Sequence, residues 1–492
     1  MIKDIENFGA IDAESDNRLK EYFCRTNIID KLLNNEKNIV IGRKGSGKTA
    51  IYKHIAESRR NFAVELSFKD YPWKVHDLFK NHEVSERESF LNSWTYLFYI
   101  EILKQCVKQK QNFQKPKQKE IRKIEKWLRR NWGAAEFSHS EIISPKRKQR
   151  FWNFSFSRSI LGTPVGAATE STEETRLGGT LTEWNKKLEK IVSELMTFFN
   201  DEIILLFDEL DLAYDNNDPN YNSRLIGLLL AVRHFHTTHA DRIKTILFLR
   251  NDIFNNLEFQ DKNKIKDNLV EFLDWDKGDS GSQLNLEDIV FARIKNNIAS
   301  DTSNFKELWE LIFDNSIVSR KQLPWSYMIS RTFLRPRDVI KFMNLSLFSA
   351  KQRLTKEPTS TEKITSDDIL KIRKDYSTYL FEELKDETST KYKQFNDYME
   401  ILRDVHKTTF DLNTFKSSYD VVNNRTKFDD SADVILERLY EFSVISFFKS
   451  GGGGTGGSEW RFQYHSDYQA FNPQALKFKV HAGFKEYLEL VE

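Results

Sequence analysis

The sequence predicts an α/β fold with a parallel sheet, followed by a helical region and a small C-terminal domain. Three observations predict it. An apolar run at residues 39–41 leads into a glycine-rich turn and then a helix. A second apolar run, residues 203–207, is followed by two adjacent carboxylates, and a third, residues 246–249, is followed by arginine. Short apolar strands that alternate with helices are typical of a parallel sheet covered by helices.

The glycine-rich turn fits the phosphate-binding loop of P-loop NTPases. Residues 42–49 read G-R-K-G-S-G-K-T and match the pattern G-x-x-x-x-G-K-[ST] in its strand-to-helix setting. The glycines let successive N–H groups turn toward a phosphate, and the start of the helix adds a favourable dipole. We therefore expect nucleotide binding by Gly42, Arg43, Lys44, Gly45, Ser46, Gly47, Lys48, Thr49 and Ala50.

Two side chains of this loop have separate expected roles. Lys48 would reach the β- and γ-phosphates and act in catalysis, and Thr49 would ligate Mg²⁺ through its hydroxyl. The expected cofactors are thus ATP and Mg²⁺. Adenine is favoured over guanine by exclusion, because residues 185–188 read N-K-K-L and lack the aspartate of a guanine-reading N-K-x-D motif.

The adjacent carboxylates Asp208 and Glu209 predict that the protein hydrolyses the nucleotide as well as binding it. Asp208, at the end of its strand, suits the Mg²⁺ shell, and Glu209 suits orienting and deprotonating the attacking water. A buried strand capped by a solvated acidic turn is the alternative interpretation, which the nearby phosphate loop disfavours.

Arg250 ends the third strand. A polar residue at the tip of the strand next to Asp208 would lie close to the γ-phosphate, so Arg250 is a candidate catalytic residue that senses this phosphate. The alternative is an ion pair with Asp208 or Asp252.

Together these residues resemble the additional-strand ATPases of the AAA+ and STAND group. The adjacent Asp-Glu pair is typical of the group, and an arginine that ends the sensor strand is similar to the STAND branch. Residues 8–16, 248–254 and 335–338 are also similar to a family of bacterial P-loop ATPases. The resemblance implies a nucleotide-sensing arginine in a helical lid, which Arg335 or Arg337 would match. Pro336 between them fits a simple helix start equally well.

Length and composition favour a multidomain cytoplasmic protein. The 492 residues predict about three domains at the usual ~150 residues each. The net charge of +2 is the small difference between 75 basic and 73 acidic residues, so the whole-chain charge gives no argument about a nucleic-acid partner, and local charge must decide. Cys24 and Cys106 are the only cysteines, which suits a reducing cytosol. No apolar stretch approaches the ~18 residues of a membrane span, so we expect no membrane contact.

Residues 1–299 are expected to form the ATPase core, with an insertion at about 68–200. Within the insertion, the aromatic residues of a helix at 90–107 have the spacing of a buried core. A basic run at 104–130 holds eleven Lys and Arg against Glu120 and Glu125, and 146–150 adds more charge. Such a run fits a grip on a phosphate backbone or a solvated helical arm equally well. Residues 155–182 are expected to form hairpins or a loop.

The C-terminal half is expected to contain a helical lid at 300–385 and then, at 386–492, a helical linker and a domain that resembles a winged helix. The resemblance depends on a helix at 433–442, strands at 444–449 and 460–464, a glycine-rich tip between the strands, and a last helix from 481. Because the tip is glycine and not Lys or Arg, docking on the ATPase core is favoured over DNA binding.

The predicted function is an ATP-binding and hydrolysing switch whose nucleotide state controls a partner protein or self-assembly into a homo-oligomer. The resemblance implies a role in bacterial antiphage defence. The alternative is a nucleic-acid-binding ATPase of the origin-recognition or transposition-helper type, which would use the basic insertion and the winged helix. Nucleic acid is the less favoured partner.

Overall fold

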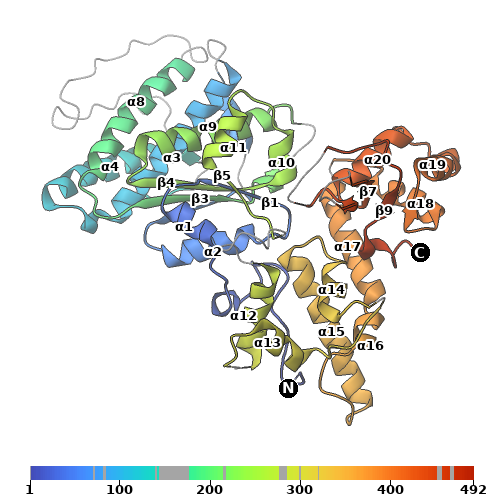
Figure 1. Cartoon of the computed structure of the whole chain (residues 1–492). Helices are drawn as coiled ribbons and strands as arrows, with labels where there is room; N and C mark the ends of the chain where they lie inside the picture. The colour runs from blue at the N-terminus through green and yellow to red at the C-terminus, as the bar shows by residue number, and fades with distance from the viewer. Residues whose placement is uncertain are drawn as a thin grey trace. The chain divides into compact units, whose positions relative to one another are not determined.

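The computed structural model describes residues 2–69, 73–80, 85–138, 141–142, 177–213, 218–275, 285–298, 301–319, 321–389, 391–451, 457–465 and 470–492 (Figure 1). The chain forms two compact units. The sheet unit comprises Asn27–Arg43 and Lys48–Leu273, and the helical unit comprises Met1–Thr26, Lys44–Gly47 and Asp274–Glu492. Each unit has its own apolar core.

A five-stranded parallel sheet forms the centre of the sheet unit, which confirms the predicted α/β fold. In the order β2-β3-β4-β1-β5, the strands are β2 (Ala63–Ser67), β3 (Ile203–Asp208), β4 (Ile243–Arg250), β1 (Ile39–Gly42) and β5 (Val270–Phe272). The three central strands are buried nearly throughout, as expected for a parallel sheet covered on both faces. Strand β4 lies between β1 and β3 and so separates the phosphate loop's strand from the Asp208 strand.

Helices cover both faces of this sheet, with α1 and α2 on one face and α3, α8 and α9 on the other (Figure 1). The helices of the sheet unit are α1 (Asn27–Leu33), α2 (Lys48–Ser58), α3 (Glu86–Lys108), α4 (Lys115–Trp132), α8 (Leu177–Met196), α9 (Tyr221–His239), α10 (Asn251–Asn256) and α11 (Lys262–Leu269).

Helix α3 belongs to the core of the sheet unit, although it lies within the expected insertion. Its aromatic side chains Trp94, Tyr96 and Tyr99 are buried, which confirms that they are core residues. The indole N–H of Trp94 donates to the carbonyl of Arg224 at 2.8 Å. The hairpins or loop expected at 155–182 are wrong for 177–182, which begin α8; residues 155–176 and 146–150 lie outside the described residues.

Helices occupy most of residues 300–385, where the sequence predicts a lid, and the role of these helices as a lid stays a prediction. They are α13 (Phe305–Ile312), α14 (Pro324–Ile329), α15 (Pro336–Lys356), α16 (Ser366–Lys371) and α17 (Arg373–Thr388), and α12 (Leu286–Ile298) precedes them.

The N-terminal segment and α12 also belong to the helical unit. From the sequence, residues 1–299 were expected to form the ATPase core. Buried polar contacts explain the difference. Arg293 of α12 forms an ion pair with Asp16 at 3.2 Å and donates to the carbonyl of Phe8 at 2.8 Å. Asn344 of α15 accepts a hydrogen bond from the N–H of Phe8 at 2.8 Å.

The last part of the helical unit combines three helices with an antiparallel sheet of order β6-β9-β7-β8. In chain order the elements are α18 (Phe395–Val405), β6 (Thr409–Phe410), α19 (Leu412–Thr426), α20 (Ala432–Glu441), β7 (Ile445–Lys449), β8 (Glu459–Arg461) and β9 (Phe478–Val480). Residues 452–456 of the expected glycine-rich tip lie outside the described residues.

The final helix expected from His481 is wrong, because the chain forms only a short 3-10 turn at Ala482–Phe484. Gly483 packs so closely that an added Cβ would lie 2.6 Å from the carbonyl oxygen of Arg331. The turn is therefore held by packing, and glycine has little helix propensity to extend it. In the described part of the chain, no helix is both long and apolar enough to cross a membrane.

Candidate functional site

The backbone of the phosphate loop has the shape that an anion cradle requires. The loop joins the end of β1 at Gly42 to the start of α2 at Lys48. Gly45 and Gly47 have φ angles of +78° and +100°, a region that glycine enters without strain. An added Cβ on Gly47 would meet no atom within 4 Å, so the space beside this residue can admit a phosphate.

Three successive carbonyl groups of this loop are held by donors of the helical unit. The guanidinium of Arg335 donates to the carbonyl of Lys44 at 3.0 Å. The backbone N–H of Arg337 lies 3.5 Å from the carbonyl oxygen of Gly45, and the indole N–H of Trp275 donates to that of Ser46 at 2.8 Å.

These donors fix the orientation of the loop's peptide groups. In a trans peptide the N–H points opposite to the C=O. Holding the carbonyls of Lys44, Gly45 and Ser46 therefore directs the N–H groups of Gly45, Ser46 and Gly47 away from the donors. Backbone N–H groups freed in this way are what binds phosphate in such loops.

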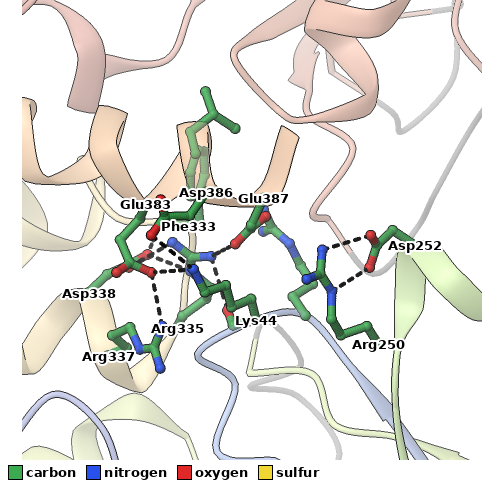
Figure 2. A network of polar contacts seen from close by, with 12 residues as sticks. Lys44, Arg250, Asp252, Phe333, Arg335, Arg337, Asp338, Glu383, Asp386 and Glu387 are labelled. Atoms are coloured by element: carbon green, nitrogen blue, oxygen red, sulfur yellow. Dashed lines mark hydrogen bonds and ion pairs between the residues drawn. The ribbon is translucent and has the colours of Figure 1, made fainter. Parts of the chain in front are cut away.

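Arg335 is buried, with 2% of its surface exposed, and precedes α15 at its N-cap position. It donates to both carboxylate oxygens of Asp338 at 2.9 Å and to Glu387 at 3.0 Å (Figure 2). Burial by itself would lower the pKa of this guanidinium, but Asp338 and Glu387 outweigh burial and raise it. Arg335 therefore stays charged and links α15, α17 and the phosphate loop.

A second set of ion pairs connects the loop to α17. Arg337 pairs with Glu383 at 2.9 Å, and the ammonium of Lys44 lies 3.4 Å from Glu383 and 3.8 Å from Asp386 (Figure 2). Burial would raise the pKa of Glu383, but Arg337 and Lys44 lower it below its usual value. Glu383, Asp386 and Glu387 share one face of α17 by their spacing, and we call them the α17 carboxylates.

In the sheet unit, Lys48 begins α2 and folds back over the loop. Its ammonium donates to the carbonyls of Gly42 and Arg43, both at 2.9 Å. Burial lowers the pKa of Lys48 to about 8, while Asp208 and Asp211 act in the opposite direction. The amine thus remains largely protonated at neutral pH and poorly solvated, which favours an anionic partner.

Asp208 ends β3 and is buried. Its Oδ2 atom has no hydrogen-bond partner among the described residues, whereas the hydroxyl of Thr49 bonds to the carboxylate. Burial raises the pKa of Asp208 to about 6, opposed by the Glu209 N–H, Lys48 and Thr49. A buried, ionisable carboxylate beside a hydroxyl fits Mg²⁺, which takes one or two protein oxygens and completes its shell with water and phosphate.

Glu209 has a strained backbone with φ of +62°, a left-handed conformation that non-glycine residues seldom adopt. The hydroxyl of Ser67 donates to its carboxylate. Ser67 ends β2 and is the register partner of Asp208 in β3. The sheet thus places a hydroxyl donor beside the predicted general base.

Arg250 ends β4 and is the register partner of Gly42 in β1, so the sheet aligns it with the start of the phosphate loop. Its guanidinium forms two hydrogen bonds with Asp252, at 3.0 and 2.8 Å, and lies 3.4 Å from Asp211 (Figure 2). The ion pair with Asp252 that the sequence left open is therefore present, while the sensing role of Arg250 stays a prediction.

Several contact residues were missed by sequence reasoning: Ser67, Trp275 and the α17 carboxylates. Ser67 and Trp275 do carry a signal, since each lies at or just after the end of a parallel strand, the sheet edge where ligands bind. The α17 carboxylates carry none, because acidic residues on a charged helix are ordinary.

Comparison with protein-family models matches residues 284–385 to the FunZ-associated C-terminal helical domain. This segment contains α12 to α16 and most of α17. No curated protein matches the sequence.

Solved structures with similarity to this chain include three proteins of the Orc1/Cdc6 type. The Orc1 protein of Aeropyrum pernix in complex with DNA is 11% identical, with 91% of this chain and 89% of that chain covered and a TM-score of 0.33. Cdc6p from Pyrobaculum aerophilum is 12% identical, with 97% and 94% covered and a TM-score of 0.28. Drosophila ORC bound to DNA is 11% identical, with 98% and 93% covered and a TM-score of 0.27.

Proposed function

We propose that this protein is an ATP-binding and hydrolysing switch whose nucleotide state moves its helical unit and thereby controls a partner protein or self-assembly. One observation carries the proposal: Arg335, Arg337 and Trp275 of the helical unit hold the carbonyls of the three loop residues Lys44, Gly45 and Ser46. A phosphate that binds to the opposite N–H groups acts on the same peptide groups, so its presence is transmitted directly to those three residues.

Different residues of the chain have different roles in the proposed reaction. Lys48 would bind the β- and γ-phosphates, and Asp208 with Thr49 would hold Mg²⁺. Bound Mg·ATP would supply the scissile β,γ-phosphoanhydride bond, which the attack of water splits into ADP and inorganic phosphate. Glu209 orients the attacking water and accepts its proton at a carboxylate oxygen. Arg250 and the pair Arg335 and Arg337 respond to loss of the γ-phosphate.

The α17 carboxylates give the switch a second state. Glu383 and Asp386 neutralise Lys44 and Arg337, two cations that a nucleotide phosphate would also attract. Phosphate and α17 thus compete for the same positive charges. Binding of ATP would weaken the hold of α17 on the loop, and loss of phosphate would restore it.

Finer assignments belong to the same proposal. We assign the chain to the STAND-like branch of P-loop ATPases on the resemblance of its motifs, with a role in antiphage defence and assembly into a homo-oligomer. The order α18, β6, α19, α20, β7, β8, β9 resembles that of a winged helix with one added strand, which supports this identity for the C-terminal domain. Fold by itself does not decide whether that domain binds DNA or docks on protein.

The test combines nucleotide binding, turnover and hydrogen exchange on the purified chain with Mg·ATP. Lys48→Ala should greatly weaken ATP binding in a folded protein, and Glu209→Gln should bind Mg·ATP but hydrolyse it ~100-fold more slowly or worse. ATP should change amide exchange in α15 and α17 of the wild type and of Glu209→Gln, but not of Lys48→Ala. Unchanged ATP affinity in Lys48→Ala would contradict the assignment of the phosphate loop. Unchanged amide exchange in the wild type on addition of ATP would contradict the coupling between the loop and the helical unit.

A further inference from the structure

Helix α4, Lys115–Trp132, separates its side chains into two faces. One face is apolar and buried, with Ile121, Ile124, Trp127, Leu128 and Trp132 at 2% exposure or less. The other is solvent-exposed and basic. Apart from Pro116, every exposed residue of the helix is a Lys or Arg: Lys115, Lys119, Lys123, Lys126, Arg122, Arg129 and Arg130.

Five of these cations form a continuous stripe that carries no carboxylate. Their three- and four-residue spacing places them on one side of the helix, and in the described part of the chain none has an ion-pair partner. The two glutamates of α4 form ion pairs with cations outside this set of five: Glu120 pairs with Lys117, and Glu125 pairs with Arg129. The five, which we call the α4 stripe, are Lys115, Lys119, Arg122, Lys126 and Arg130.

The stripe opposes helix stability, unlike an ordinary solvated face. Like charges four residues apart repel each other and destabilise a helix. The stripe contains three such pairs: Lys115 with Lys119, Arg122 with Lys126, and Lys126 with Arg130. A solvated face would gain by alternating the sign of its charges. The repulsion between the positive charges of the stripe would be relieved by a bound polyanion.

We propose that the α4 stripe binds the phosphate backbone of double-stranded nucleic acid without reading its sequence. From residue 115 to 130 the stripe is ~22 Å long at 1.5 Å per residue. That length corresponds to about six phosphates of one strand, which follow each other at ~3.4 Å along the duplex axis. The proposal goes beyond the ATP switch and does not depend on it.

The side chains that are absent from the exposed face identify the kind of partner. Single strands are held by aromatic side chains on which bases stack, but Trp127 and Trp132 are both only 2% exposed. Bidentate reading of adenine needs an exposed Asn or Gln, and Gln118, beside the face, donates its amide to the carbonyl of Phe113. A membrane surface would need large apolar side chains to insert, and the apolar residue exposed on α4 is Pro116 alone.

The experiment measures binding of the full chain to a fluorescein-labelled 30-bp duplex of mixed sequence, over a range of salt concentrations. The stripe variant carries Gln at Lys115, Lys119, Arg122, Lys126 and Arg130. A control variant loses the same charge from exposed positions of the helical unit, with Gln at Lys306, Lys356, Lys371, Lys374 and Arg425. Helicity and thermal unfolding establish that both variants are folded.

We expect the stripe variant to bind the duplex ~100-fold more weakly near 100 mM salt. Its log–log salt slope should be shallower by up to about 4.5, at ~0.9 for each of five cations. The control variant should behave like the wild type. Equal losses in both variants would reduce the effect to net charge and overturn the proposal. So would a labelled single strand or polyglutamate that binds as tightly as the duplex, since either points to a different partner.

Discussion

The indole N–H of Trp275 donates to the backbone carbonyl of Ser46 at 2.8 Å, although the two residues are 229 positions apart. Trp275 follows β5, and Ser46 lies in the phosphate loop. Both residues belong to the helical unit. The carbonyl of Ser46 shares its peptide group with the N–H of Gly47, so the contact helps to set the direction of that N–H. It is the simplest of the three contacts by which the helical unit orients the loop.

Trp275→Phe should weaken ATP binding about fivefold. The substitution keeps an aromatic ring but removes the donor, and a hydrogen bond of this kind contributes about 1 kcal/mol. Titration calorimetry with a slowly hydrolysed ATP analogue measures the change. Trp460→Phe, at a partly buried tryptophan in β8, is the matched control and should leave affinity unchanged. Equal affinities in all three proteins would show that the loop does not need the donor.

Glu383→Gln should tighten ATP binding several-fold. The substitution removes the carboxylate that neutralises Arg337 and Lys44, so both cations become available to phosphate. Glu382→Gln, at the exposed neighbouring position, removes the same charge without touching either cation and is the control. If Glu383→Gln bound ATP more weakly than its control, Glu383 would support the site and not compete with the nucleotide.

Glu209→Gly should be more stable than Glu209→Ala by about 0.5–1 kcal/mol. Both variants lose the carboxylate and its contact with Ser67, so they differ in how they tolerate the φ of +62°. The left-handed conformation costs alanine roughly 1–2 kcal/mol, and the greater freedom of glycine in the unfolded chain offsets ~0.4–1 kcal/mol of this. Urea unfolding of the two proteins measures the difference. A more stable alanine variant would show that Glu209 is not strained.

Binding of Mg·ATP should be strongest between about pH 6 and pH 8. Burial raises the pKa of Asp208 to about 6. Below pH 6 the carboxyl group must therefore lose a proton before it can hold Mg²⁺, so the affinity for Mg·ATP should fall up to tenfold per pH unit. Burial lowers the pKa of Lys48 to about 8. Above pH 8 the amine must therefore gain a proton before it can bind phosphate, so the affinity should fall again. Affinities measured from pH 5 to pH 9 test both limbs.

Asp208→Asn provides the control for this profile. It lacks the titrating carboxylate, so its weaker nucleotide binding should show no acid limb below pH 6 beyond that of the nucleotide itself. An identical acid limb in the variant would assign the effect to another group.

The sequence by itself determined the features that depend on neighbours along the chain. Strand β1, the glycines at 45 and 47, Lys48 and the start of α2 lie within a dozen residues, so local geometry and the motif suffice to predict them. The same holds for Asp208 at the end of an apolar strand and for the basic run of α4. A final helix from His481 was predicted wrongly, because the tight packing of Gly483 against Arg331 is not visible in the local sequence.

Only the tertiary structure decided which distant residues meet. The strand order β2-β3-β4-β1-β5 aligns Arg250 with Gly42 and Ser67 with Asp208, and register is a property of the whole sheet. Arg335 reaches the carbonyl of Lys44 across 291 positions, and its charge is tolerated in a buried place because Asp338 and Glu387 surround it. Such contacts depend on how helices and strands pack, since an exposed and a buried arginine look alike in a sequence.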